Sequence, residues 1–113
     1  MKKLLFAALA LSCILLPAEA KKKVRVHTIG DSTMADYAEN TTRTRGWGEM
    51  FQEFFSDDVE VMNYARGGRS TRSFINEGLW DKVKANIRKG DYVLIQFAHN
   101  DEKGGGTYSD DGR

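Results

Sequence analysis

Cysteine is almost absent from this sequence: among 113 residues only Cys13 carries a thiol, so no disulfide can form within the chain. The cellular compartment therefore cannot be argued from disulfides. An excess of charge is lacking as well, because 17 Lys and Arg residues stand against 16 Asp and Glu residues, a net charge of +1. This balance gives no sign of attraction to nucleic acid or to an anionic membrane surface.

A membrane-spanning run is also missing. The apolar segment Leu4–Leu16 has 13 residues, too few to cross about 30 Å of hydrocarbon. Two lysines precede it and Ala18-Glu19-Ala20 follows, which together predict a signal peptide over residues 1–20 and a secreted or periplasmic product without further membrane attachment. A lipid anchor at Cys13 is the weaker alternative, because the apolar run continues past it. Cleavage would leave a 93-residue domain, residues 21–113, with no cysteine and with equal numbers of basic and acidic residues.

Strand-like and helix-like segments alternate along the rest of the chain. β-Branched and apolar residues predict three strands, and apolar residues at helical spacing predict two helices. The strands are residues 24–29, 59–62 and 92–97, and the helices are residues 47–55 and 79–87, the second ended by Gly90. The run 92–97 is nearly all apolar, which is typical of a strand buried on both faces. This order predicts parallel βαβ units, whose ligand crevice lies beyond the carboxyl ends of the strands.

The residues that follow each predicted strand are the unusual ones. Ser32 lies on the turn after the first strand, where it is either an exposed nucleophile or an ordinary polar cap. The pair Gly67-Gly68 follows the second strand, and it either exposes backbone N–H groups or forms a flexible turn. Asn100 follows the third strand, where its side chain either donates to an oxyanion or caps a turn. Because all three follow parallel strands, we expect them at one edge of the sheet.

Other chemistries fit the sequence less well. His99 directly precedes Asn100 and so is expected to face another way, and His27 lies within the first predicted strand as a core or edge residue. The histidines and carboxylates match no recognised metal-ligand spacing. The motifs of a phosphate-binding loop and of a dinucleotide-binding fold are both absent, which argues against a nucleotide site.

Three blocks of the sequence resemble those of the SGNH (GDSL-type) hydrolase superfamily. They are Gly30-Asp31-Ser32-Thr33-Met34, Asn63 to Ser70, and His99-Asn100-Asp101. Within the superfamily, the stretches Gly46-Trp47-Gly48-Glu49 and Gly90-Asp91-Tyr92-Val93 are similar to rhamnogalacturonan acetylesterases. The resemblance implies an α/β fold of the three-layer αβα, flavodoxin-like type with a parallel sheet, of which this chain would carry the first three strands and two helices.

The resemblance also implies roles for individual residues. Ser32 would be the nucleophile and give a backbone N–H to the oxyanion hole, which Gly68 and Asn100 would complete. The reaction implied is deacetylation of a polysaccharide, with an acetylated polysaccharide as the partner and no metal or organic cofactor. Arg69 and Arg72 are open to two interpretations, contact with uronate carboxylates or anchoring of the loop. Nothing in the sequence predicts an oligomeric state.

The fourth block of the family, Asp-x-x-His, has no match in the 113 residues. This block supplies the general base and its orienting carboxylate, so we expect the chain as written to be inactive or nearly so. The alternatives are a non-catalytic carbohydrate-binding remnant and a gene fragment without independent function. A strand as apolar as 92–97 should not lie at an open edge, which suggests that the family fold needs further strands beside it.

Overall fold

The three predicted strands pair in one parallel sheet with β1 (Val24–Gly30) at its centre. The computed structural model describes residues 22–37 and 42–103, so the predicted signal peptide lies outside the described residues. β2 (Val59–Asn63) and β3 (Tyr92–Gln96) flank β1 on its two sides, in the order β2-β1-β3. In the register, Thr28 lies opposite Asn63, and Gly30 lies opposite Gln96. The carboxyl ends of all three strands therefore meet at one edge.

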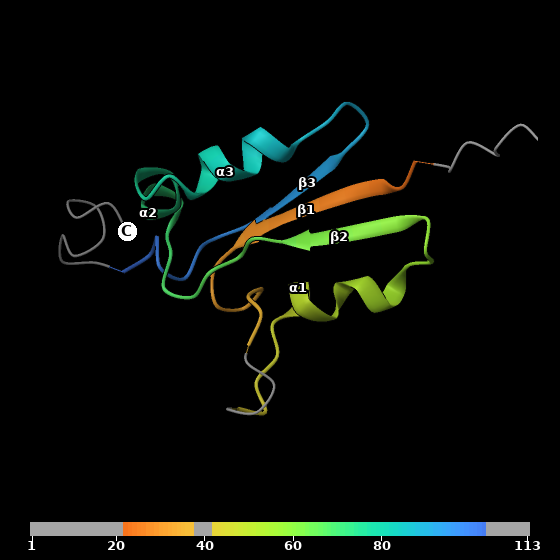
Figure 1. The fold of residues 1–113 in the computed structure, drawn as a ribbon. Coiled ribbons are helices and arrows are strands. Elements are labelled where there is room, and N and C mark those ends of the chain that lie inside the picture. The colour runs from red at the N-terminus through yellow and green to blue at the C-terminus, as the bar shows by residue number, and fades with distance from the viewer. Residues whose placement is uncertain (1–21, 38–41, 104–113) are drawn as a thin grey trace, which may run out of the picture.

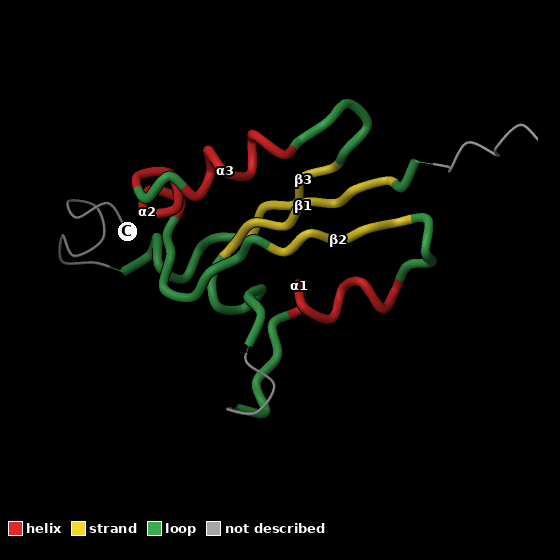
Figure 2. The backbone as a smooth tube through the Cα atoms, in the orientation of Figure 1, coloured by secondary structure: helices red, strands yellow, loops and turns green. Residues whose placement is uncertain are grey.

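Helices lie on both sides of this sheet, which gives the three layers of the expected α/β fold (Figure 1). α2 (Thr71–Asn76) and α3 (Leu79–Asn86) cover one face. α1 (Trp47–Met50) and the 3₁₀-helix η1 (Phe51–Phe54) cover the other, as the secondary-structure colouring in Figure 2 also shows. No helix within the two described ranges is long and apolar enough to cross a membrane.

The core lies between the sheet and the α2–α3 layer. Ile29 of β1 packs with Phe74 of α2 and with Leu79 and Val83 of α3, and all four side chains are buried. Full burial of a side chain of this kind stabilises the fold by about 1.5–3 kcal/mol. The aromatic ring of Phe97, just after β3, meets Phe74 edge-on at 5.4 Å between centroids. This packing fixes the loop after β3 against α2.

Both expected helical segments form, with differences in detail, and one further helix is present. The predicted helix 47–55 is a single α-turn that continues as the 3₁₀-helix η1, and the side chain of Phe54 is exposed. α2 was not predicted at all; it begins at a capping box in which Ser70 and Ser73 exchange side-chain to backbone hydrogen bonds. α3 ends at Asn86, and Gly90 lies instead in the turn that leads into β3, with a φ of +91°.

β3 is also not buried on both faces, contrary to the expectation from its composition. Tyr92 is 62% exposed and Ile95 64% exposed, and Leu94 between them is exposed as well. In the part of the chain that the structure describes, β3 is an edge strand of the sheet.

Candidate active site

The turn after β1 carries Ser32 and is held in place by hydrogen bonds to Asp31. The Asp31 carboxylate is fully buried and accepts hydrogen bonds from the backbone N–H of Thr33 at 3.0 Å and from its hydroxyl at 2.8 Å. The Asp31 carbonyl oxygen accepts from the N–H groups of Met34 and Ala35 at 3.2 and 3.1 Å. Ser32 itself is partly exposed at the top of this turn, so a ligand can reach it.

Two further contacts tie this turn to other segments. Gln96, the last residue of β3, lies with its side-chain nitrogen 3.4 Å from both carboxylate oxygens of Asp31, and its Oε1 lies 2.6 Å from the Thr33 hydroxyl. The Tyr37 hydroxyl donates to the carbonyl oxygen of Ser32 at 2.5 Å. The position of Ser32 is therefore fixed by a neighbouring strand and by a residue five positions further along the chain.

The loop after β2 runs directly alongside this turn. Backbone hydrogen bonds from Tyr64 to Thr28 (2.8 Å) and from Arg66 to Gly30 (3.0 Å) continue the pairing with β1 past the end of the strand. The glycine pair is thereby brought to Ser32: a Cβ atom added to Gly67 would lie 3.7 Å from the Cβ atom of Ser32. Gly68 has a φ of +76°, a conformation that favours glycine, and a Cβ atom there would meet no described atom within 4 Å.

The loop after β3 closes onto the loop after β2. The Asn100 side chain is 3% exposed, and its NH2 group donates to the carbonyl oxygen of Arg69 at 2.9 Å. An amide NH2 carries two hydrogens, so this bond leaves one for a ligand. The neighbouring Asp101 carboxylate accepts from the backbone N–H of Thr71 at 3.0 Å and from the Thr71 hydroxyl.

The structure thus places Ser32, Gly68 and Asn100 at the same edge of the sheet. The loops after β2 and β3 hydrogen-bond to each other, and the turn that carries Ser32 is linked to them through the last residues of β1 and β3. An oxyanion hole needs fixed N–H donors that converge on one point without bringing a charge of their own. Backbone N–H groups and an amide side chain are donors of that kind. The catalytic roles of the three residues remain predictions.

Arg69 is engaged within the protein. Its guanidinium forms two hydrogen bonds with the Glu77 carboxylate, at 2.8 and 2.9 Å, and a third with the carbonyl oxygen of Gly67 at 2.9 Å. The Arg69 guanidinium lowers the pKa of Glu77 below its ordinary value. Of the two interpretations of Arg69, these contacts favour anchoring of the loop. Arg72 is exposed on α2.

No contact with Ser32 is found for either histidine among the described residues. His27 is completely buried inside β1, with its Nε2 atom 2.7 Å from the Asp91 carboxylate, at the amino end of β3. His27 lies three positions before Gly30, roughly 10 Å along the strand. His99 is exposed on the loop before Asn100.

No cluster of three or more metal-ligating side chains is found in residues 22–37 and 42–103. The polar residues that the sequence analysis missed are Asp31, Tyr37 and Gln96, which hold the turn rather than face a ligand. A signal for Gln96 was available, because it is the single amide in an otherwise apolar strand.

Comparison with known proteins agrees with this geometry. Residues 26–110 match the family model of the GDSL-like lipases and acylhydrolases. The chain belongs to this GDSL-like family. It is 46% identical over 87 residues to rhamnogalacturonan acetylesterase RhgT of Bacillus subtilis, and 42% identical over 88 residues to a rhamnogalacturonan acetylesterase of Emericella nidulans.

A solved structure confirms the GDSL-like fold. The crystal structure of YxiM from Bacillus subtilis is similar with a TM-score of 0.67 and 31% sequence identity, over 73% of this chain and 24% of that one. The matches cover 77% and 78% of this chain but only 38% and 32% of the two acetylesterases. The chain therefore spans less than half the length of the GDSL-like relatives it matches.

Proposed function

We propose that this chain supplies the nucleophile and the oxyanion hole of a serine esterase that removes acetyl groups from a pectic polysaccharide. The observation that carries the proposal is the joining of three loops at the carboxyl edge of the sheet. Gly67 lies directly against Ser32, and Asn100 is bound to the loop that contains Gly68. The names of the two acetylesterase relatives support the substrate class.

The proposed reaction begins with attack of the Ser32 hydroxyl on the acetyl carbonyl carbon. A histidine base takes the hydroxyl proton, and a carboxylate holds that histidine in the correct tautomer. The oxygen that becomes negative accepts from the backbone N–H groups of Ser32 and Gly68 and from the Asn100 NH2. One such donor contributes about 2.7–4 kcal/mol of barrier lowering. The intermediate then collapses: the bond to the sugar oxygen breaks, and the polysaccharide leaves as a free hydroxyl after taking the proton from the histidine. Water, deprotonated by the same histidine, then cleaves the acetyl-serine, which releases acetate and restores the Ser32 hydroxyl.

In this proposal the general base that takes the Ser32 proton is not among these 113 residues. His27 is buried and bound to Asp91, and His99 is exposed beside Asn100 rather than aimed at Ser32 by any described contact. A serine hydroxyl without a base is a weak nucleophile at neutral pH. We therefore propose that these 113 residues alone are inactive or nearly so. We also propose, from the signal-peptide pattern of residues 1–20, that the chain is exported and cleaved after residue 20.

A chimera tests the proposed role of Ser32. The segment of RhgT that aligns with this chain is replaced by the corresponding residues of this chain, and acetate release from acetylated rhamnogalacturonan is measured. We expect activity in the chimera and a loss of at least about 10³-fold in Ser32→Ala, because the nucleophile is removed. Ser56→Ala, an exposed serine in the turn before β2, is the matched control and should keep full activity.

A folded chimera that is equally active with and without Ser32 would contradict the proposal. The printed chain is assayed in parallel on an activated acetyl ester. If it shows ordinary esterase turnover that Ser32→Ala abolishes, the missing-base part is wrong and one of its own histidines is the base. If it binds the polysaccharide without hydrolysis and Ser32→Ala leaves the chimera unchanged, the non-catalytic alternative is correct.

A further inference from the structure

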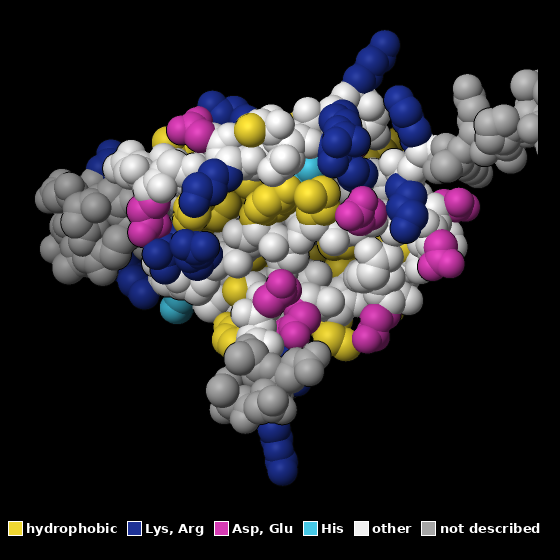
Figure 3. Space-filling model, in the orientation of Figure 1, with side chains coloured by type: hydrophobic (Ala, Val, Ile, Leu, Met, Phe, Trp, Pro, Cys, Tyr) yellow, Lys and Arg dark blue, Asp and Glu magenta, His cyan; other side chains and the backbone are white. Residues whose placement is uncertain are grey.

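A second polar hollow lies at the opposite edge of the sheet. The amino ends of β1 and β3 and the turn before β3 enclose a cavity of about 430 Å³. Its charged lining is mainly basic, and the basic residues are Lys22, Lys23, Arg25, Arg88 and Lys89. Figure 3 shows Lys and Arg side chains at this end of the molecule, with Asp and Glu side chains beside them. We call this cavity the basic hollow.

One of its two carboxylates is already neutralised within the protein. Asp91 accepts from the Arg25 guanidinium at 2.8 and 3.1 Å, from His27 at 2.7 Å, and from the backbone N–H of Arg88 at 2.9 Å. Arg25 and His27 hold the pKa of Asp91 well below its ordinary value. Arg25 also donates to the carbonyl oxygen of Asn86. Asp91 and Arg25 therefore cancel each other and are fixed in place.

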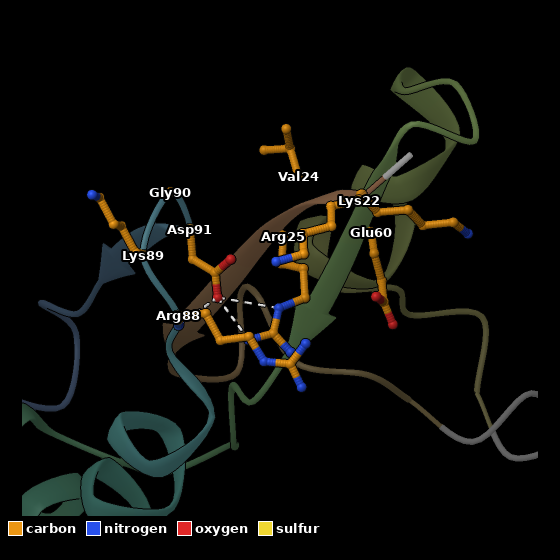
Figure 4. Close-up of a pocket in the computed structure, with 9 residues that line it drawn as sticks. Lys22, Val24, Arg25, Glu60, Arg88, Lys89, Gly90 and Asp91 are labelled. Atoms are coloured by element: carbon orange, nitrogen blue, oxygen red, sulfur yellow. Dashed lines mark hydrogen bonds and ion pairs between the residues drawn. The ribbon is translucent and has the colours of Figure 1, made fainter. Parts of the chain in front are cut away.

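The other four cations of the basic hollow stand against Glu60 alone. Among the residues that the structure describes, Lys22, Lys23, Arg88 and Lys89 form no ion pair. In Figure 4 the amino group of Lys89 points away from Asp91. The lining of the basic hollow thus carries more positive than negative charge, and such a charge attracts anions. Asp57 and Asp58 lie outside this lining, in the turn before β2.

The turn that presents two of these cations is well fixed. Asp91 accepts from the N–H of Arg88 through its side chain and donates its own N–H to the Arg88 carbonyl oxygen at 3.0 Å. The turn includes Gly90 at a φ of +91°. Arg88 and Lys89 are therefore held in place by their main chain, which reduces the entropy lost when they bind a ligand.

We propose that the basic hollow binds the carboxylate groups of an anionic, uronate-containing polysaccharide, at a place separate from Ser32. This inference rests on the proposed function for its substrate class, since a pectic polymer carries uronates along its length. A guanidinium binds a carboxylate through two parallel hydrogen bonds, and lysine ammonium groups add point charges beside it. β1 separates the two places by about 23 Å, so one long polymer can reach both.

The lining favours a polysaccharide over other polyanions. Single-stranded nucleic acids bind by stacking bases on aromatic rings, and the lining of the hollow contains no aromatic side chain. A membrane surface is bound by charge together with inserted apolar side chains, and Val24 is the single apolar side chain here. Two contacts on one polymer raise the effective concentration of esters near Ser32.

The test measures binding of the full chain to unacetylated polygalacturonate by calorimetry, at low and at about 0.15 M ionic strength. We expect Arg88→Ser/Lys89→Ser to weaken binding about tenfold, since each exposed charge contact contributes up to about 1 kcal/mol. The control Arg43→Ser/Lys103→Ser removes two exposed charges outside the hollow and should change affinity less than twofold. Binding should weaken as salt rises.

Equal losses in the two double variants, or no loss in either, would overturn the proposal. So would tighter binding to an oligonucleotide of equal charge or to anionic lipid vesicles. If Arg88→Ser/Lys89→Ser loses its circular dichroism spectrum, Lys22→Ser/Lys23→Ser replaces it with the same expected result. Polygalacturonate has no ester, so its binding is measured independently of hydrolysis. If the chain binds polygalacturonate but the chimera releases no acetate, the proposed function is refuted while the proposed binding site in the basic hollow is supported.

Discussion

At the carboxyl ends of the strands the three loops are held together by hydrogen bonds that mostly end on main-chain atoms. The acceptor in each of three such bonds is a main-chain carbonyl oxygen. The Arg66 N–H donates to Gly30, the Tyr37 hydroxyl to Ser32, and the Asn100 NH2 group to Arg69. At the amino ends a single carboxylate, Asp91, gathers an arginine and a histidine instead. At the carboxyl ends the buried Asp31 carboxylate and the Asp101 carboxylate accept hydrogen bonds from neutral N–H and hydroxyl groups. At the amino ends the carboxylate is instead paired with a cation, Arg25.

The two ends of the sheet are therefore suited to different roles, catalysis at the carboxyl ends of the strands and stabilisation of the fold at the amino ends. Neutral donors can stabilise the negative oxygen that develops in the transition state. They bring no full charge that would bind the substrate equally well before the reaction, so their effect falls on the rate. A buried charge pair fixes structure but must stay paired, because a single uncompensated charge is strongly unfavourable. Changes at the carboxyl edge should therefore alter rate, and changes around Asp91 should alter stability.

Among the substitutions that compare the two ends of the sheet, replacement of Asn100 is expected to have the largest effect on activity. In the chimera, Asn100→Ala should lower kcat by about 10²–10³-fold with little change in KM, because the donor acts mainly in the transition state. Asn76→Ala, at the exposed end of α2, is the control. A fall in activity that follows only the fraction of unfolded protein would assign Asn100 a purely structural role.

Replacement of Asp91 tests the other end. Asp91→Asn should lower the urea midpoint at pH 7 while leaving kcat in the chimera unchanged. The folded-state pKa of Asp91 is depressed, so its stabilising contribution is present above the usual carboxyl pKa of about 3.9 and is lost as the pH falls below it. The difference between wild type and variant should therefore shrink below pH about 4. Asp57→Asn, an exposed carboxylate, should show no such difference.

The two adjacent glycines provide a matched pair of smaller effect. Gly68→Ala should destabilise the chain by about 1–2 kcal/mol through its positive φ alone, because no described atom lies within 4 Å of the new Cβ. Gly67→Ala has an ordinary φ and should leave stability nearly unchanged, but its methyl group would contact Ser32 at 3.7 Å and hinder substrate. Equal urea midpoints for the two variants would show that the loop relaxes.

The smallest effect is expected from the exposed ion pair behind the loop. Glu77→Gln should reduce stability by less than about 1 kcal/mol, and by less still at high salt, because both partners remain in contact with solvent. Arg69 keeps its bond to the Gly67 carbonyl oxygen in this variant. Glu102→Gln serves as the control, and a loss several times larger than expected would show that Arg69 has no alternative anchor.

The sequence predicted the strands and the common edge because both depend on local composition. Apolar, β-branched segments separated by helical ones leave few topologies, and parallel strands then bring Ser32, Gly68 and Asn100 to one side. α2 was missed since six residues, Thr71–Asn76, are too short to show a period. Its start is marked only by the serine pair of the capping box.

Contacts between distant residues could not be predicted from composition. Gln96 and Asp31 are 65 positions apart, and only the register of β1 and β3 brings them together. The same holds for His27 and Asp91, 64 positions apart. The apolar character of β3 predicted burial, but burial also depends on whether other segments cover the strand.

The exposed edge of β3 affects how this polypeptide behaves in solution. A strand of five residues with exposed Tyr92, Leu94 and Ile95 side chains presents a row of backbone groups ready to pair with any extended segment. Strand addition between copies grows with protein concentration. Purification of the chain on its own is therefore expected to need dilute solutions, and turbidity should rise at concentrations that a closed sheet would tolerate.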